Sequence, residues 1–131
     1  MSTQQDPTAV SVARAHVDAW GNHDYERARE SLAPEVHVVV TSVDPIAPKV
    51  DTTGIDEYME GLVQFGTGVL PGTSRVSSAI GDETRALLQV TSTVKFGPDA
   101  PEMTLHGARL YRLDENGKIA DEQVIFFVAP H

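Results

Sequence analysis

The second half of the chain is a succession of β-type runs, each ended by a strong turn signal, and this feature constrains the fold most. Four runs rich in β-branched and aromatic residues lie at positions 75–80, 85–96, 103–113 and 118–128. The turns GDET, GPDAP and DENG separate them. Because short turns join antiparallel neighbours, we predict a four-stranded meander whose apolar face needs a covering layer.

The first half carries helical patterns that can supply this layer. Asp6 as N-cap and Pro7 in the first turn are typical of a helix start. The helical spacing of Val10, Val17 and Trp20 gives that helix an apolar side. The sequence predicts helices at 7–22, 24–32 and 55–65, a strand at 35–43, and a proline-containing loop at 44–54.

Length and composition fit one domain over residues 1–131. The formal net charge of −9 argues against a nucleic-acid partner and against an anionic membrane surface. The absence of cysteine excludes disulfides, thiolate metal sites and a cysteine nucleophile. No apolar run approaches the roughly 18 residues of a membrane span, and the N-terminus lacks a secretory signal pattern, so we expect a cytoplasmic protein.

Three stretches resemble the NTF2-like superfamily, which includes ketosteroid isomerases, SnoaL-type polyketide cyclases and limonene-epoxide hydrolases. They are HVDAWGNHDYERARESLAPEV at 16–36, TTGIDEYMEGL at 52–62 and GARLYRLDENGKIADEQVIFF at 107–127. The resemblance covers nearly the whole chain. It implies an α+β cone, with three helices of the N-terminal half packed on a curved antiparallel β-sheet. It also implies an apolar pocket at the mouth of the cone and, as in many members, a homodimer through the outer sheet face.

The ketosteroid isomerase pattern carries over only in part. The position of its substrate-binding tyrosine falls on His16, and that of its oxyanion-hole aspartate falls at about Arg109. The position of its proton-transferring aspartate falls near Val40 or Thr41, neither of which is a base. The resemblance therefore does not imply the double-bond isomerase mechanism. Asp44 lies a few residues later and enters the pocket only if the strand bulges.

The SnoaL-type pattern is a looser match. It has an acidic acid/base residue on the last strand, and this position lands near Glu122, with Asp121 as the alternative in a neighbouring register. Its histidine on the preceding strand lands near Arg109, three residues from His106. This departure from the pattern leaves the cyclase reaction open.

Arg109 and Glu122 are of interest together. A four-residue DENG loop places them opposite each other, whereas a three-residue loop with a bulge at Gly117 places Arg109 opposite Gln123. A buried pair could orient an anionic or carbonyl substrate. The alternative is a surface salt bridge across two strands, which contributes less than about 1 kcal/mol.

His16 lies on the apolar side of the first predicted helix, between Ala13 and Trp20. A histidine there is either a neutral core residue or a pocket residue that exchanges a proton near neutral pH. Because the resemblance places a functional side chain at this position, we expect His16 to face the cavity.

The remaining side chains give candidates for the pocket wall but not for a metal site. The candidates for substrate binding are Trp20, Val40, Tyr58, Met59, Phe65, Tyr111 and Val124. Phe127 is a further aromatic side chain that could line the cavity. The five histidines have no tight ligand spacing, so we expect neither a metal nor another cofactor.

These patterns favour a small cofactor-independent enzyme that acts on an apolar, ring-containing metabolite by acid/base chemistry, in a cyclisation, an isomerisation or an epoxide opening. In this interpretation His16 polarises an oxygen and Arg109 holds charge, while Glu122 or Asp44 moves a proton. Two alternatives stay open. One is a non-catalytic module that binds an apolar molecule in the cavity; the other is a dimeric interaction protein that works through its exposed sheet face.

Overall fold

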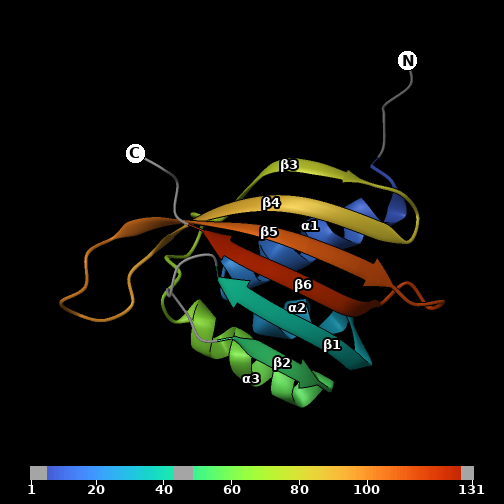
Figure 1. Cartoon of the computed structure of the whole chain (residues 1–131), viewed down its shortest axis with the longest axis horizontal. Coiled ribbons are helices and arrows are strands. Elements are labelled where there is room, and N and C mark those ends of the chain that lie inside the picture. Colours follow the sequence, from blue (N-terminus) through green and yellow to red (C-terminus); the bar gives the residue numbers. More distant parts are fainter. Residues whose placement is uncertain (1–5, 43–48, 128–131) are drawn as a thin grey trace.

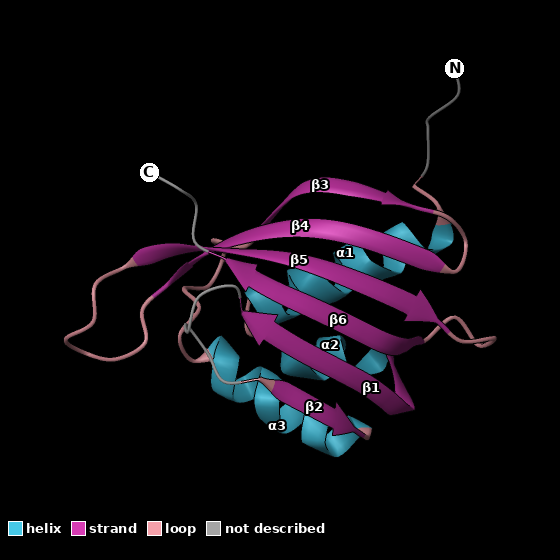
Figure 2. Cartoon of the chain, viewed as in Figure 1, coloured by secondary structure: helices cyan, strands magenta, loops and turns pink. Residues whose placement is uncertain are grey.

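The computed structural model describes residues 6–42 and 49–127. Three helices lie on one face of a six-stranded sheet, which confirms the predicted α+β architecture (Figures 1 and 2). The helices are α1 (Thr8–Gly21), α2 (Tyr25–Glu30) and α3 (Ile55–Gly66). The strands are β1 (Leu32–Ser42), β2 (Val50–Thr53), β3 (Arg75–Gly81), β4 (Arg85–Val94), β5 (Met103–Leu113) and β6 (Ile119–Phe127).

The strand order is β2-β1-β6-β5-β4-β3, and the predicted meander of β3 to β6 is antiparallel throughout. The sheet as a whole is mixed, however, because β1 and β6 run parallel. Two hydrogen bonds show why. The backbone N–H of Ile119 donates to the carbonyl of Ser31 (2.8 Å), and Nζ of Lys118 donates to the carbonyl of Glu30 (2.7 Å). Both strands therefore start at the same edge of the sheet.

The prediction of a loop over residues 44–54 is wrong for its last part, which forms β2. This strand pairs antiparallel with β1 and places Val50 opposite Val40. It has only four residues and a single β-branched apolar side chain, which is too little for a pattern to develop. Its identity as a strand depends on the neighbouring β1.

The start of α1 also differs from the prediction. The N-cap is Pro7, without a side-chain capping hydrogen bond. Asp6 instead forms an ion pair with Nε of Arg14 (2.9 Å). Asp24 does cap α2, because its carboxylate accepts from the backbone N–H of Arg27 (3.3 Å).

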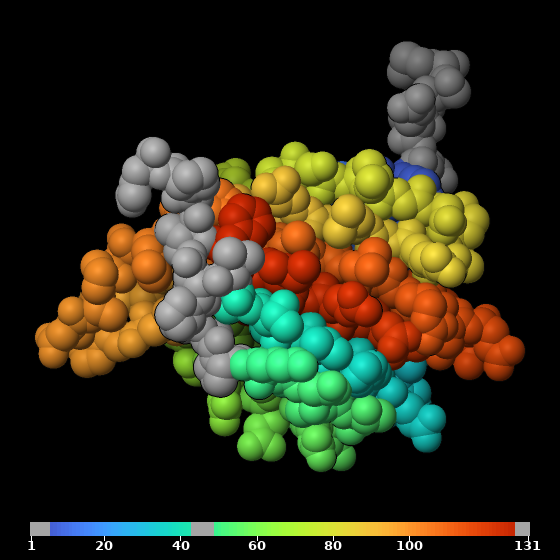
Figure 3. All heavy atoms as spheres, in the orientation of Figure 1, coloured from blue at the N-terminus to red at the C-terminus, as the bar shows by residue number. Residues whose placement is uncertain are grey.

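The core lies between the helices and the inner face of the sheet. Helix α1 packs over β3, β4 and β5, whereas α3 covers β1 and β2 (Figure 1). The opposite face, turned to the viewer in Figure 3, carries no helix. Its exposed large apolar side chains include Ile80, Leu87, Leu110 and Ile125.

A cluster of charged side chains crosses the strands on this outer face. Nε2 of His37 lies 2.8 Å from a carboxylate oxygen of Asp51, and its Nδ1 lies 3.5 Å from one of Asp121. Asp121 also accepts from Nε of Arg112 (2.7 Å). The hydrogen bond with Asp51, and then the charges of both carboxylates, raise the pKa of His37 above its usual value of 6.5.

We predict that Asp51→Asn lowers the pKa of His37 toward 6.5. The raised pKa means that the pairing stabilises the fold below the pKa of the unfolded chain and is lost as the pH rises through the folded-state value. An NMR titration of the His37 imidazole measures this shift. Asp56→Asn is the matched control, because Asp56 pairs with Arg29 (2.8 Å) and not with His37. An unchanged midpoint in Asp51→Asn would contradict the prediction.

Candidate active site

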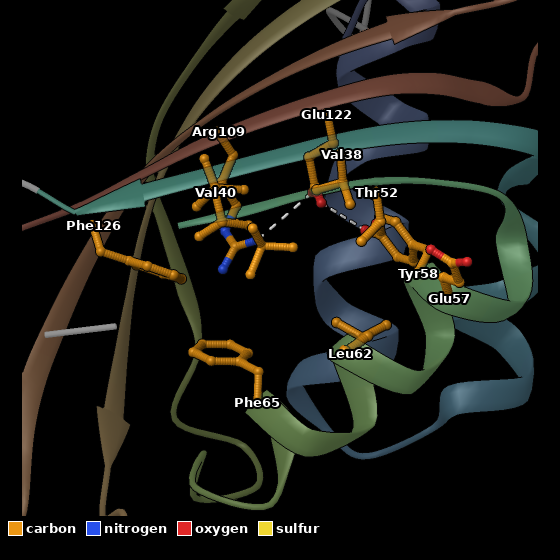
Figure 4. A pocket seen from close by; sticks show the side chains of 13 residues that line it. Val38, Val40, Thr52, Glu57, Tyr58, Leu62, Phe65, Arg109, Glu122 and Phe126 are labelled. Atoms are coloured by element: carbon orange, nitrogen blue, oxygen red, sulfur yellow. Dashed lines mark hydrogen bonds and ion pairs between the residues drawn. The ribbon is translucent and has the colours of Figure 1, made fainter. Parts of the chain in front are cut away.

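A cavity of about 160 Å³ lies between α3 and the inner face of β1, β2, β5 and β6 (Figure 4). Its wall is almost entirely apolar, as expected of a small-molecule site. The residues that line it are Val38, Val40, Val50, Thr52, Glu57, Tyr58, Gly61, Leu62, Phe65, Arg109, Glu122, Val124 and Phe126.

Two charged side chains, Arg109 of β5 and Glu122 of β6, lie at the sheet side of this cavity (Figure 4). They are 4% and 3% exposed, and Nη1 of Arg109 lies 3.6 Å from Oε2 of Glu122. This distance is an ion pair but not a hydrogen bond. Of the two possibilities left open by the sequence, the buried pair is present and the surface salt bridge is not.

The register that brings the pair together is neither of the two considered from the sequence. Arg109 lies opposite Val124, and Glu122 lies opposite Tyr111. The pairing is shifted between Arg112 and Leu113, and the extra residue on β6 is Ala120. Arg109 and Glu122 consequently meet as diagonal neighbours on one face of the sheet, where long side chains remain within reach.

Three aromatic rings surround the guanidinium group of Arg109. Its central carbon lies 4.6 Å from the ring centre of Trp20, 5.5 Å from that of Phe126 and 5.8 Å from that of Phe65. Such cation–π contacts stabilise a desolvated cation. They satisfy none of its N–H groups, however, and Nε has no hydrogen-bond partner among the described residues. The guanidinium group can therefore donate to a ligand.

The carboxyl group of Glu122 is hydrogen-bonded on one oxygen only. Oε1 lies 2.7 Å from the hydroxyl oxygen of Tyr58, whereas Oε2 has no hydrogen-bond partner within the described chain. Burial, and then the charge of Glu122, raise the pKa of Tyr58 and of Tyr111 well above the usual value of 10. Both phenols therefore keep their protons near neutral pH.

His16 is buried behind Tyr58 and does not line the cavity. Its Nε2 lies 2.9 Å from the Tyr58 hydroxyl, and its Nδ1 lies 3.1 Å from the carbonyl of Ala28 and 3.0 Å from Oγ of Ser31. Burial lowers the pKa of His16. The expectation that His16 faces the cavity is wrong, because Tyr58 of α3 lies in between. His16 reaches the site only through that hydroxyl group.

Four of the predicted wall residues do line the cavity: Val40, Tyr58, Phe65 and Val124. Trp20 and Tyr111 do not, because both are fully buried in the core, Trp20 beneath Arg109. Met59 is partly buried against the core and also lies outside the wall. Asp44 lies outside the described residues.

The alternative positions on β5 and β6 point away from the cavity. Asp121 pairs with Arg112 on the outer face, which excludes it as the acid/base residue in place of Glu122. His106 stacks on Phe127, with ring centres 5.3 Å apart. Phe126, and not Phe127, therefore lines the cavity.

Sequence reasoning missed seven wall residues, of which three had a usable signal. Val38 alternates with Val40, Phe126 alternates with Val124, and Leu62 lies four residues after Tyr58 on one helix face. Val50 and Thr52 had no signal, because β2 was not predicted. The complete set is Val38, Val50, Thr52, Glu57, Gly61, Leu62 and Phe126.

The residues that the structure describes contain no group of three or more histidine, aspartate or glutamate side chains arranged to hold a metal ion. In the same ranges, no helix has the length and apolar character needed to cross a membrane.

A family model for the SnoaL-like domain matches residues 13–122, so the chain belongs to the SnoaL-like family. Among solved structures, a protein from Kribbella flavida DSM 17836 is similar with a TM-score of 0.71 and 25% identity, over 91% of this chain and 86% of its own. An LEH-like epoxide hydrolase from M. tuberculosis is similar with a TM-score of 0.68 and 16% identity, over 91% of this chain and 82% of its own. A third similar structure is a Catenulispora acidiphila DSM 44928 protein with a ketosteroid isomerase-like fold, in complex with trimethylamine. Its TM-score is 0.72 and its identity 12%, over 92% of this chain and 85% of its own. A search of curated proteins finds no match.

We predict that Trp20 and Arg109 are energetically coupled. Trp20→Leu should lower the free energy of unfolding by roughly 3 kcal/mol, because a buried aromatic side chain is truncated. Arg109→Met should cost less in that background than in the wild type, by roughly 1 kcal/mol, because the cation–π contact is already lost. Denaturant unfolding of the four proteins measures the difference.

Val10→Ala provides the control for this cycle. Val10 is buried on α1 but lies ten residues before Trp20, roughly 15 Å along the helix axis. Its cost should add to that of Arg109→Met. If the costs of Trp20→Leu and Arg109→Met also add in the double variant, the ring of Trp20 does not stabilise the cation.

Proposed function

We propose that this protein is a cofactor-independent acid/base enzyme for a small, neutral, ring-containing molecule that carries an oxygen acceptor. One observation carries the proposal: Arg109 and Glu122 meet at the cavity, each with a buried polar atom that no group of the described residues satisfies. Buried polar groups are normally paired, and unpaired ones mark functional sites. A ligand oxygen at this point would complete both side chains.

The size and charge of the cavity support a single-ring substrate. Its volume of about 160 Å³ is close to the roughly 150 Å³ of an apolar cavity that holds benzene. A carboxylate ligand would meet the carboxyl group of Glu122 and that of Glu57 in the same wall. A ketone, an enone or an epoxide avoids this repulsion and still accepts a hydrogen bond from Arg109.

The same two residues can serve more than one of the expected reaction types. In an isomerisation, Glu122 carries a proton from one carbon of the substrate to another. The guanidinium group of Arg109 meanwhile stabilises the negative charge that develops on the substrate oxygen. In an epoxide opening, Glu122 gives a proton to the ring oxygen as the C–O bond breaks. Water then adds to the carbon and returns a proton to Glu122. The similarity to the LEH-like epoxide hydrolase supports testing this second reaction.

We predict that the purified protein catalyses proton exchange or ring opening on members of a panel of single-ring ketones, enones and epoxides. Glu122→Gln should lower the rate by about 100-fold or more, because the amide cannot exchange a proton. Glu60→Gln is the matched control, since Glu60 is an exposed residue of α3 outside the cavity wall and should leave the rate unchanged. NMR in deuterated buffer detects exchange, and mass spectrometry detects ring opening.

The same panel distinguishes the two alternative functions. A compound that binds and raises the melting temperature, with neither deuterium incorporation nor a product, indicates the non-catalytic binding module. No binding by any compound leaves the outer sheet face as the working surface and overturns the proposed enzyme.

A further inference from the structure

A chain of three side chains leads from the cavity into the core. Oε1 of Glu122 lies 2.7 Å from the hydroxyl oxygen of Tyr58, and that oxygen lies 2.9 Å from Nε2 of His16. Both distances are those of hydrogen bonds, so each contact contains one hydrogen. Glu122 and His16 are 3% and 1% exposed, so water cannot replace a missing hydrogen at low cost.

The far end of the chain fixes one proton on His16. Nδ1 lies 3.1 Å from the carbonyl oxygen of Ala28 and 3.0 Å from Oγ of Ser31. The Ser31 hydroxyl is itself within hydrogen-bond distance of that carbonyl and donates to it (2.9 Å). A carbonyl only accepts, and the one serine hydrogen cannot fill both contacts of Nδ1, so a hydrogen on Nδ1 completes these contacts whereas a bare Nδ1 leaves the contact with Ala28 without a hydrogen.

The two remaining contacts need two hydrogens, and Tyr58 supplies only one. A neutral His16 with its hydrogen on Nδ1 has a bare Nε2, and an ionised Glu122 has no hydrogen at all. With that combination, either Nε2 and the phenol oxygen or the phenol oxygen and Oε1 would face each other without a hydrogen. Such a contact between two acceptors is repulsive at these distances.

We propose that His16, Tyr58 and Glu122 hold one additional proton in common, so that His16 sets the protonation state of the cavity carboxyl group. In one arrangement Glu122 donates to Tyr58 and Tyr58 donates to Nε2 of a neutral His16. In the other, a doubly protonated His16 donates to Tyr58, which donates to an ionised Glu122. Each hydrogen crosses one hydrogen bond between the two arrangements, and the total charge is unchanged. The inference deepens the proposed function and rests on it for the role of Glu122.

Burial favours the first arrangement, in which neither group is charged, whereas the guanidinium group 3.6 Å from Glu122 favours an ionised carboxyl group. The charged or titratable groups that face the chain are Arg109 and Tyr111, both of β5, and burial dominates the lowered pKa of His16. A neutral His16 leaves the proton on Glu122, where it is available to a substrate oxygen. His16 is then a positioning residue, because it acts through Tyr58 and does not touch the cavity.

NMR on the wild-type protein tests the shared proton directly, with ¹⁵N-labelled histidine and ¹³C-labelled glutamate carboxyl groups. We expect the spectra to show the additional proton, either as a protonated Glu122 with the neutral Nδ1–H tautomer of His16 or in the second arrangement. A doubly protonated His16 with an ionised Glu122 is the second arrangement of the shared proton and also supports the inference. A neutral His16 together with an ionised Glu122 overturns it.

Two variants test whether the proton depends on the chain. His16→Phe removes the acceptor at Nε2, and Tyr58→Phe removes the hydroxyl but keeps the ring. If the wild type has the proton on Glu122, the carboxyl signal of Glu122 should change from the protonated to the ionised form in each variant. If the wild type instead has the proton on His16, Tyr58→Phe should leave His16 neutral at the same pH. An unchanged state of both groups in Tyr58→Phe contradicts the inference.

The signal of His37 serves as the folding control, because its pairing with Asp51 requires the native register of β1 and β2. Should one variant fail to fold, the wild-type spectra and the other variant still decide the question. The outcome also separates this inference from the proposed function. A shared proton without turnover on the panel removes the function alone. Turnover that depends on Glu122, without a shared proton, removes the inference alone.

Discussion

The meeting of a guanidinium group and a carboxyl group in an apolar interior is the interaction on which the rest of the site depends. Removing a guanidinium group and a carboxyl group from water costs free energy, and at 3.6 Å the two groups do not form a hydrogen bond that would offset this cost. The fold compensates on both sides. Aromatic rings surround Arg109, and the Tyr58–His16 chain satisfies one oxygen of Glu122. The atoms that stay unsatisfied belong to two side chains that line the cavity, which is where a substrate would contribute its own polar atom.

The elements that build this environment come from distant parts of the sequence. Helix α1 supplies the ring beneath the cation and the imidazole behind the carboxyl group, but no residue of the cavity wall. Helix α3 supplies the opposite wall and the hydroxyl that links the two layers. The parallel pairing of β1 with β6 places the valines of β1 beside Glu122. Helix α1, helix α3 and the sheet therefore each contribute different groups, and the site forms only when these three parts pack together.

The sequence predicts the helices and the four strands of the meander because their periodicity is local. It identifies Arg109 and Glu122 as candidates but does not predict that they share a face, because this depends on the hairpin register and the observed register was not considered. It does not predict β2, whose four residues carry no pattern, or the parallel pair, which joins strands about 80 residues apart and follows no local rule. The place of His16 behind Tyr58 is equally hidden, because the apolar side of a helix does not reveal which neighbour covers it.

The extra residue Ala120 also decides which face of the sheet each side chain of β6 occupies. The DENG turn closes with Gly117 at a φ of 76°, a conformation that favours glycine, and Ala120 then advances the strand by one position. A hairpin that closed without this bulge would move Glu122 to the outer face and bring Asp121 inward, because side chains alternate at every residue. The turn and the bulge together determine which carboxyl group of β6 lies beside the cavity. A register slipped by one residue would place Asp121 on the inner face without the contacts that Glu122 makes, which disfavours the slipped form.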